Sequence, residues 1–166
     1  MIRSKLAAAA FFASLLTLAG AQTGGAATSE SRDASTAYIG TANFVVGRVG
    51  RDCLSLLGRT DTPQSFVAVW QQRNFQYLMA SQKYMEARFS EAEATGGMEK
   101  KNAIIGSLNA AVRSGAESTV KSWLDRPDKI EACKRAISLI ESKAYDVSPT
   151  TPMYGELESL VAWAQR

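Results

Sequence analysis

The two cysteines are the residues whose chemistry is best defined by their number and spacing. Cys53 and Cys133 are the only cysteines in 166 residues, and neither belongs to a Cys-x-x-Cys redox or metal-binding pattern. In an oxidising compartment such a pair forms a disulfide. Each also falls on the apolar face of a helix that the hydrophobic period predicts. We therefore expect one disulfide between two helices; the alternative is two separate buried thiols.

A stripe of aromatic residues with basic neighbours is the second set that could carry a function. Trp70, Tyr77 and Tyr84 recur every seven residues on one face of a predicted helix, with Arg73 and Arg88 close by. Tyrosine and tryptophan join an apolar ring to a polar atom and are enriched at protein interfaces. These five residues form a candidate interaction surface. The alternative is that the rings belong to the core and only their polar tips reach solvent.

A group of glutamates near the middle of the chain is the third set, formed by Glu86, Glu91, Glu93 and Glu99. Glycosidases use two carboxylates across a cleft, so this group would support a cell-wall or sugar-polymer hydrolase if at least two converged in one. Lys100 and Lys101 follow directly, and mixed charges of this kind are typical of a solvated helix face. We expect the solvated face.

The absence of histidine excludes much of the remaining chemistry. It removes histidine-based acid–base catalysis, Ser-His and Cys-His nucleophile pairs, histidine-ligated haem and mixed Cys/His zinc sites. The sequence also lacks an EF-hand calcium loop, a phosphate-binding P-loop and a dinucleotide-binding glycine motif. We therefore predict no metal, no cofactor and no enzymatic activity.

The first 21 residues read as a secretory signal peptide. Arg3 and Lys5 give a basic start, residues 6–19 are largely apolar, and Ala19-Gly20-Ala21 supplies small residues for cleavage. The apolar run is shorter than the roughly 20 residues that span a bilayer, so we expect no membrane span after cleavage. The prediction is a periplasmic or secreted protein.

Removal of that segment leaves an almost neutral protein. The chain has 19 Lys and Arg residues, and without Arg3 and Lys5 it has 17 against 16 Asp and Glu residues. A nucleic-acid-binding protein carries a strong basic excess instead. We therefore expect no nucleic-acid partner.

The rest of the chain shows a helical period interrupted by proline and glycine. Residues 22–35 are rich in small and polar side chains and predict a flexible leader. Residues 36–166 predict one helical domain in which Thr62-Pro63, Gly96-Gly97 and Pro127 mark boundaries. The expected helices are 36–57, 63–95, 98–125, 127–144 and 152–164.

These elements predict an all-α protein, a disulfide-linked bundle of four to five helices. The short Gly-Gly joint predicts a long antiparallel hairpin of the second and third helices. The function class that fits best is an exported binding module acting by protein–protein contact. An inhibitor or immunity factor, a chaperone-like protein or an envelope accessory protein would fit, with an envelope or secreted protein as partner. The alternative is a carrier of a small apolar ligand, with a pocket between helices.

Overall fold

The computed structural model describes residues 29–166, which form five α-helices and no strand. The all-α prediction is confirmed. The expected signal peptide, residues 1–21, and the first part of the expected leader, residues 22–28, lie outside the described residues. The helices are α1 (Ser29–Cys53), α2 (Pro63–Arg73), α3 (Phe75–Leu124), α4 (Lys129–Glu141) and α5 (Tyr154–Ala164).

The first helix begins earlier than its composition suggests. α1 starts at Ser29, so the prediction of a flexible leader up to residue 35 is wrong for residues 29–35. Polar contacts hold this turn: the Tyr84 hydroxyl donates to Asp33 Oδ1 at 2.7 Å and contacts the Ser29 carbonyl oxygen at 3.0 Å. These contacts come from Tyr84, on a helix far away in the sequence. Residues 29–35 are mainly polar, so the local pattern did not indicate a helix there.

The helix expected over 63–95 is broken near its start. Thr62 and Ser65 form the expected cap, with Pro63 at the first helical position, but α2 ends at Arg73. The buried Asn74 side chain donates to the Trp70 carbonyl oxygen at 2.9 Å and accepts from the Val147 backbone N–H at 2.8 Å. A side chain that bonds the backbone in this way competes with the helix, so α3 starts in a new direction.

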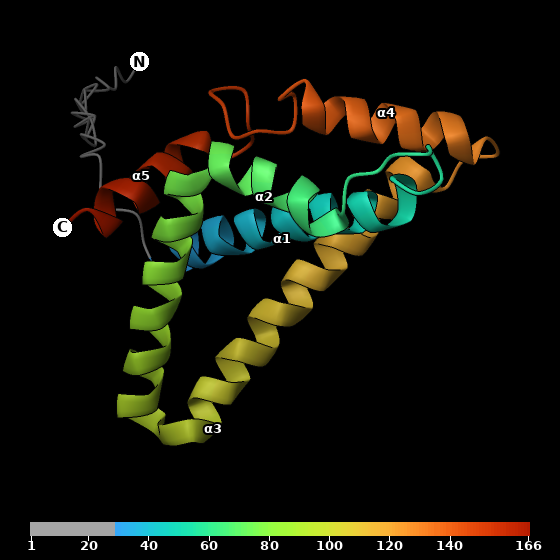
Figure 1. Cartoon of the computed structure of the whole chain (residues 1–166). Helices are drawn as coiled ribbons and strands as arrows, with labels where there is room; N and C mark the ends of the chain where they lie inside the picture. Colours follow the sequence, from blue (N-terminus) through green and yellow to red (C-terminus); the bar gives the residue numbers. More distant parts are fainter. Residues whose placement is uncertain (1–28) are drawn as a thin grey trace, which may run out of the picture.

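α3 is a V rather than a single rod (Figure 1). The vertex is Gly96-Gly97, where both residues leave helical geometry and Gly97 adopts a positive φ of 64°. The chain reverses where the sequence predicts, but the first limb (residues 75–95) and the second limb (residues 98–124) diverge from the vertex. Figure 1 shows α1 crossing the open end of the V.

α1 is the central element, and it contacts all four other helices. Two buried clusters lie along it. One joins α1 to α3 and α5: Ile39, Tyr77, Ala80, Tyr84, Leu157, Leu160 and Val161. The other joins α1 to α2, α3 and α4: Ala42, Val45, Val46, Val49, Cys53, Leu54, Phe66, Trp70, Ala116, Cys133, Ala136, Ile137 and Ile140.

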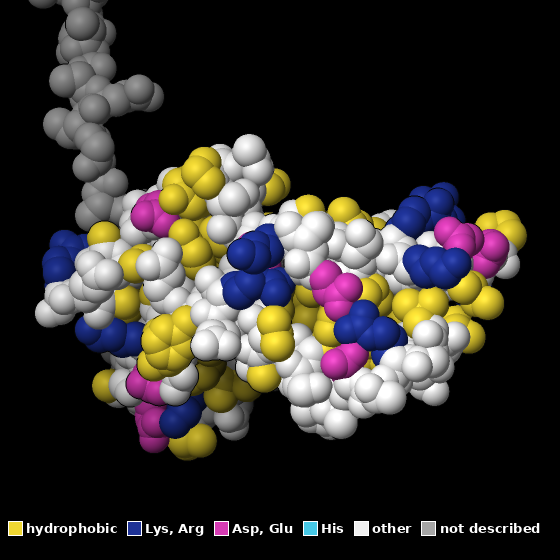
Figure 2. Space-filling model, turned by 45° about the horizontal axis from the view of Figure 1, so that its top comes forward, with side chains coloured by type: hydrophobic (Ala, Val, Ile, Leu, Met, Phe, Trp, Pro, Cys, Tyr) yellow, Lys and Arg dark blue, Asp and Glu magenta, His cyan; other side chains and the backbone are white. Residues whose placement is uncertain are grey.

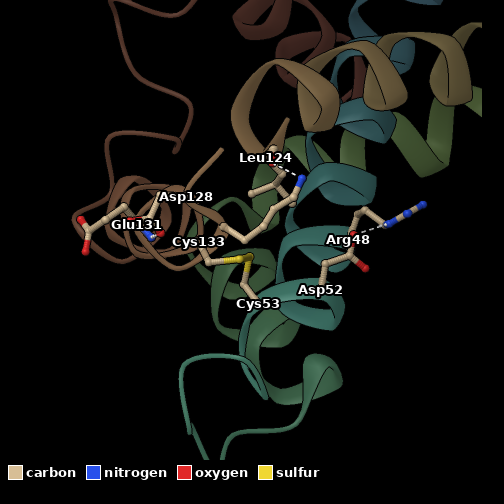
Figure 3. Close-up of a disulfide and its surroundings, with 8 residues drawn as sticks. Arg48, Asp52, Cys53, Leu124, Asp128, Glu131 and Cys133 are labelled. Carbon is tan, nitrogen blue, oxygen red and sulfur yellow. Dashed lines mark hydrogen bonds and ion pairs between the residues drawn. A yellow bond between two sulfur atoms is a disulfide. The ribbon is translucent and has the colours of Figure 1, made fainter. Parts of the chain in front are cut away.

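The Cys53–Cys133 disulfide is confirmed. It links the end of α1 to α4 with a Cα–Cα distance of 5.2 Å, and both cysteines are buried (Figure 3). The boundaries of α4 are narrower than expected, since Asp128 caps the helix by accepting from the Glu131 N–H at 3.0 Å. Ile130 is 47% exposed because it lies in the first turn, ahead of the packed part of α4.

No helix within residues 29–166 is both long enough and apolar enough to cross a bilayer.

Candidate functional site

The structure separates the five residues of the predicted interaction surface. Trp70, Tyr77 and Tyr84 are buried, Trp70 completely. The Trp70 Nε1–H donates to the Tyr145 carbonyl oxygen at 3.2 Å, and the Tyr77 hydroxyl donates to Glu158 at 2.6 Å. The core alternative therefore describes these rings: Trp70 packs in the cluster of α1, α2, α3 and α4, and Tyr77 and Tyr84 pack in the cluster of α1, α3 and α5, so the three do not form one exposed surface.

The two arginines of the predicted surface have different surroundings. Arg73 forms an ion pair with Asp146, with 2.7 Å between Nε and Oδ2, and its guanidinium is thereby committed to the fold. Arg88 lies 3.6 Å from Asp33 and 3.4 Å from Glu91, at the wall of a pocket. Burial, followed by the hydrogen bond to Asp33, raises the pKa of the neighbouring Tyr84 above its usual 10.0.

The glutamates on α3 do not converge. Glu86 accepts from Gln82 at 3.0 Å, Glu91 pairs with Arg88, and Glu93 pairs with Lys101 at 2.6 Å. None of these carboxylates, nor Glu99, lines a pocket found among the described residues. The geometry required of a two-carboxylate hydrolase is therefore not met by this group.

A groove lies between α1, α2 and the two diverging limbs of α3. We call it the amide groove, and it encloses about 650 Å³. Its floor is apolar, and Phe75 and Met79 stand at its edge with exposed fractions of 61% and 45%. The groove is lined by Thr36, Ile39, Gly40, Asn43, Gln71, Gln72, Phe75, Leu78, Met79, Ser81, Gln82, Met85, Leu108, Asn109 and Val112.

The chemistry of the amide groove is uniform. None of the described residues that line it carries a charge, and five of them carry side-chain amides. Two buried hydroxyls in its lining, Thr36 Oγ1 and Ser81 Oγ, have no hydrogen-bond partner within residues 29–166. The groove thus combines apolar contact area with neutral donors and acceptors, and it can cover an uncharged apolar surface at little desolvation cost.

A second opening lies deeper in the V. This apolar pocket encloses about 480 Å³ and shares Thr36, Met85 and Leu108 with the amide groove. Its other walls are mainly apolar, with charged residues at one end: Glu30, Asp33, Ala34, Ala37, Tyr84, Arg88, Phe89, Ile104, Ser107 and Ala111. Both openings exist because the inner faces of the limbs diverge instead of packing together.

The sequence contains a pattern that corresponds to the groove, but the aromatic stripe beside it is the stronger pattern. Phe75, Leu78 and Met85 form a second apolar stripe beside the aromatic one, and a wide arc of this kind predicts a helix with two neighbours. The structure gives the aromatic stripe to the core and leaves part of the second stripe uncovered. The amides of Gln71, Gln72 and Gln82 gave no separate signal, because isolated amides are common on any surface.

The face of the molecule drawn in Figure 2 mixes the two signs of charge. Figure 2 shows hydrophobic side chains in several small groups, with basic and acidic side chains near one another between them. Among residues 29–166, no group of three His, Cys, Asp or Glu side chains could hold a metal ion. Comparisons with protein families, curated proteins and solved structures find no match to this chain.

Proposed function

We propose that this protein is an exported binding module and that the amide groove takes the apolar face of an amphipathic helix from a partner protein. The observation that carries the proposal is the exposure of Phe75 and Met79 beside a charge-free lining. Interface cores are depleted of charged residues and enriched in aromatic residues and methionine. An amphipathic helix in a groove is a recurring recognition mode.

The framework around the groove supports such a role. The disulfide joins α1 to α4, while Arg73 and Asp146 tie the end of α2 to the connection before α5. These links hold two walls of the groove in place before a partner arrives, which lowers the entropy cost of binding. Met79 and Met85 add adaptability, because methionine side chains adjust to irregular surfaces.

The compartment belongs to the same proposal. A disulfide persists in oxidising environments outside the cytosol, and the first 21 residues have the pattern of a secretory signal. The partner is then a periplasmic, envelope or secreted protein. An inhibitor or immunity factor, a chaperone-like protein and an envelope accessory protein would all act by such contact.

The experiment is site-specific photo-crosslinking in the native host. A photoreactive phenylalanine at Met79 samples the groove, and the same residue at Ala110 samples an exposed position that lines none of the pockets. We expect Met79 to yield a discrete crosslinked partner that Ala110 does not. The identified partner is then purified, and its Kd is measured against the wild type and Met79→Glu.

Met79→Glu places a charge in the neutral groove, so we expect affinity for the partner to fall about tenfold or more. The thermal midpoint stays close to that of the wild type, because Met79 is 45% exposed. Equal affinity of the partner for both proteins, or identical crosslinks from both positions, would overturn the proposal.

The apolar pocket favours a second candidate, a carrier of small apolar ligands, because its volume and lining suit one. The probe is N-phenyl-1-naphthylamine, which fluoresces in apolar surroundings. We expect enhanced emission with the wild type and with Ala110→Phe, but not with Ala111→Phe, which fills the pocket. Equal emission from both variants would exclude this site.

A further inference from the structure

Another groove, separate from the apolar pocket, adjoins the amide groove and differs from it in charge. It lies between α1 and α2 and encloses about 700 Å³. We call it the basic pocket, because its charged residues are Arg48 and Arg51. The remaining lining is neutral: Asn43, Phe44, Gly47, Pro63, Gln64, Val67 and Gln71.

The amide groove and the basic pocket are continuous, and a hydrogen bond between two residues that line both, which we call the bridge, lies at their boundary. Asn43 and Gln71 line both of them, and Gln71 Nε2 donates to Asn43 Oδ1 at 2.9 Å. This hydrogen bond joins α1 to α2 at the boundary between the neutral and the basic part. A segment that crosses the bridge therefore meets both surfaces at once.

The residues of α1 that face the two openings follow the helical repeat. Thr36, Gly40 and Asn43 line the amide groove, and Asn43, Gly47 and Arg51 line the basic pocket. At 1.5 Å per residue, this strip of α1 is about 22 Å long. A partner helix of about 15 residues matches that length.

The basic pocket has a net positive charge. Arg48 pairs with Asp52 at 2.7 Å, and both side chains extend away from the disulfide (Figure 3). The negative charge of Glu117 also raises the pKa of Arg48, from a longer distance. Arg51 is exposed, and its side chain makes no ion pair within the described part of the chain. Arg51 thus places a positive charge without an ion-pair partner among residues 29–166 at the end of an otherwise neutral strip.

From this arrangement we infer that the partner helix carries acidic residues at one end of its apolar stripe, and that these lie against Arg51 and Arg48. The inference rests on the proposed function and adds the charge pattern of the partner. The apolar stripe covers the amide groove, and the acidic end fixes the direction in which the helix lies. Complementary charge also raises the association rate and penalises a basic segment.

Synthetic helices test the charge pattern without knowledge of the natural partner. Each 18-residue peptide has leucine and alanine on one face and glutamine on the other. The set has four members. Two carry a pair of glutamates, one at the N-terminal end and the other at the C-terminal end, and two carry a pair of lysines at the same positions. Titration calorimetry with the full mature protein gives the affinities.

We expect one glutamate peptide to bind about tenfold more tightly than the corresponding lysine peptide, with a preference that shrinks as salt rises. Arg51→Glu should reverse the preference. Arg113→Glu is the matched control, since Arg113 is exposed and lines none of the pockets, and it should leave the preference unchanged.

The outcomes separate the inference from the proposed function. Peptides that bind with no charge preference, yet lose binding in Met79→Glu, would overturn the acidic end and support the groove. A preference that persists in Arg51→Glu would also overturn the inference. Failure of every peptide to bind the wild type would overturn both.

Discussion

Arg73 and Asp146 hold each other through two contacts, with Nε donating to Oδ2 at 2.7 Å and Nη2 donating to Oδ1 at 3.0 Å. The same guanidinium donates to the Ile140 carbonyl oxygen at 2.7 Å. Asn74, beside Arg73, contacts Asp146 Oδ1 at 3.3 Å. One carboxylate therefore connects the break between α2 and α3 with the segment that leads from α4 to α5.

Arg73→Lys removes the two-point contact while keeping the charge. A lysine ammonium cannot reproduce the planar pairing with Asp146 and the bond to Ile140 together, so we expect the free energy of unfolding to fall by about 1–2 kcal/mol. Urea unfolding followed by circular dichroism measures it. Lys134→Met is the control, because Lys134 forms only an exposed pair with Glu131. Equal loss in both variants would contradict the role of Arg73.

The disulfide closes a long loop, with 80 residues of separation between Cys53 and Cys133. The double variant Cys53→Ala/Cys133→Ala should lose about 2–4 kcal/mol of stability, largely because its unfolded chain is less constrained. Urea unfolding with and without reductant checks this. Reductant should lower the wild-type midpoint and leave that of the double variant unchanged; a reductant-insensitive wild type would be the contrary result.

Thr36→Val should stabilise the protein, which is unusual for a change at a buried position. The Thr36 hydroxyl is buried without a partner among the described residues, and a methyl group of similar size has no polar atom to desolvate. We expect the free energy of unfolding to rise by about 1 kcal/mol. Thermal and urea unfolding measure the change.

Thr41→Val is the matched control on the same helix. The Thr41 hydroxyl donates to the Val112 carbonyl oxygen at 3.4 Å, across the contact between α1 and α3. Its removal should therefore lower stability, by about 0.5–1 kcal/mol. The same sign of change in both variants would show that the hydrogen bonds do not decide the effect.

Buried tyrosines predict a loss of stability at alkaline pH. Burial, and then the hydrogen bond to Glu158, raises the pKa of Tyr77 above its unfolded value of 10.0, and Tyr84 behaves alike beside Asp33. The unfolded state then loses protons that the folded state keeps. The stabilisation is complete below pH 10.0 and declines as pH rises toward the folded pKa.

Urea midpoints measured from about pH 8 to pH 11 check this decline. The slope should be shallower in Tyr77→Phe and Tyr84→Phe, since each removes one of the protons that the two states hold differently. The comparison uses slopes, so the hydrogen bonds lost at neutral pH do not affect it. Unchanged slopes in both variants would be evidence against the assignment.

The vertex of the V depends on Gly97. Its φ of 64° is unfavourable for a residue with a side chain, although nothing lies within 4 Å of an added Cβ. With ψ at −166°, this backbone conformation is one that essentially only glycine adopts, so Gly97→Ala should lower the free energy of unfolding by about 1–3 kcal/mol through the backbone alone. Gly106→Ala has equal space but lies inside the second limb, and it should gain about 0.5–1 kcal/mol. Urea unfolding compares the two, and equal signs would refute the explanation.

Local patterns predicted most of the secondary structure, and long-range contacts account for the errors. Proline at residue 63, the glycine pair at 96–97 and the apolar faces around Cys53 and Cys133 were sufficient for the start of α2, the reversal within α3 and the disulfide. No proline or glycine marks the break at Asn74 in the sequence. The break depends on hydrogen bonds that join Asn74 to Asp146 and Val147, which lie more than 70 residues away.

The groove could not be predicted for a related reason. Trp70 and Met79 lie on the same stretch of sequence, and hydrophobicity alone ranks tryptophan as the stronger interface residue. Which of the two is covered depends on the turn at Asn74 and on where α1 crosses α3. The sequence therefore indicated that the region carries excess apolar surface, but not which part remains exposed.

The central position of α1 has a consequence for the order in which this protein is made. Ile39 near its start is buried in a cluster with Leu157 and Leu160 of α5, which is made more than 100 residues later. The nascent chain therefore carries uncovered apolar surface on α1 until α5 has been made, and a truncation that removes α5 leaves this part of the first helix without its partner.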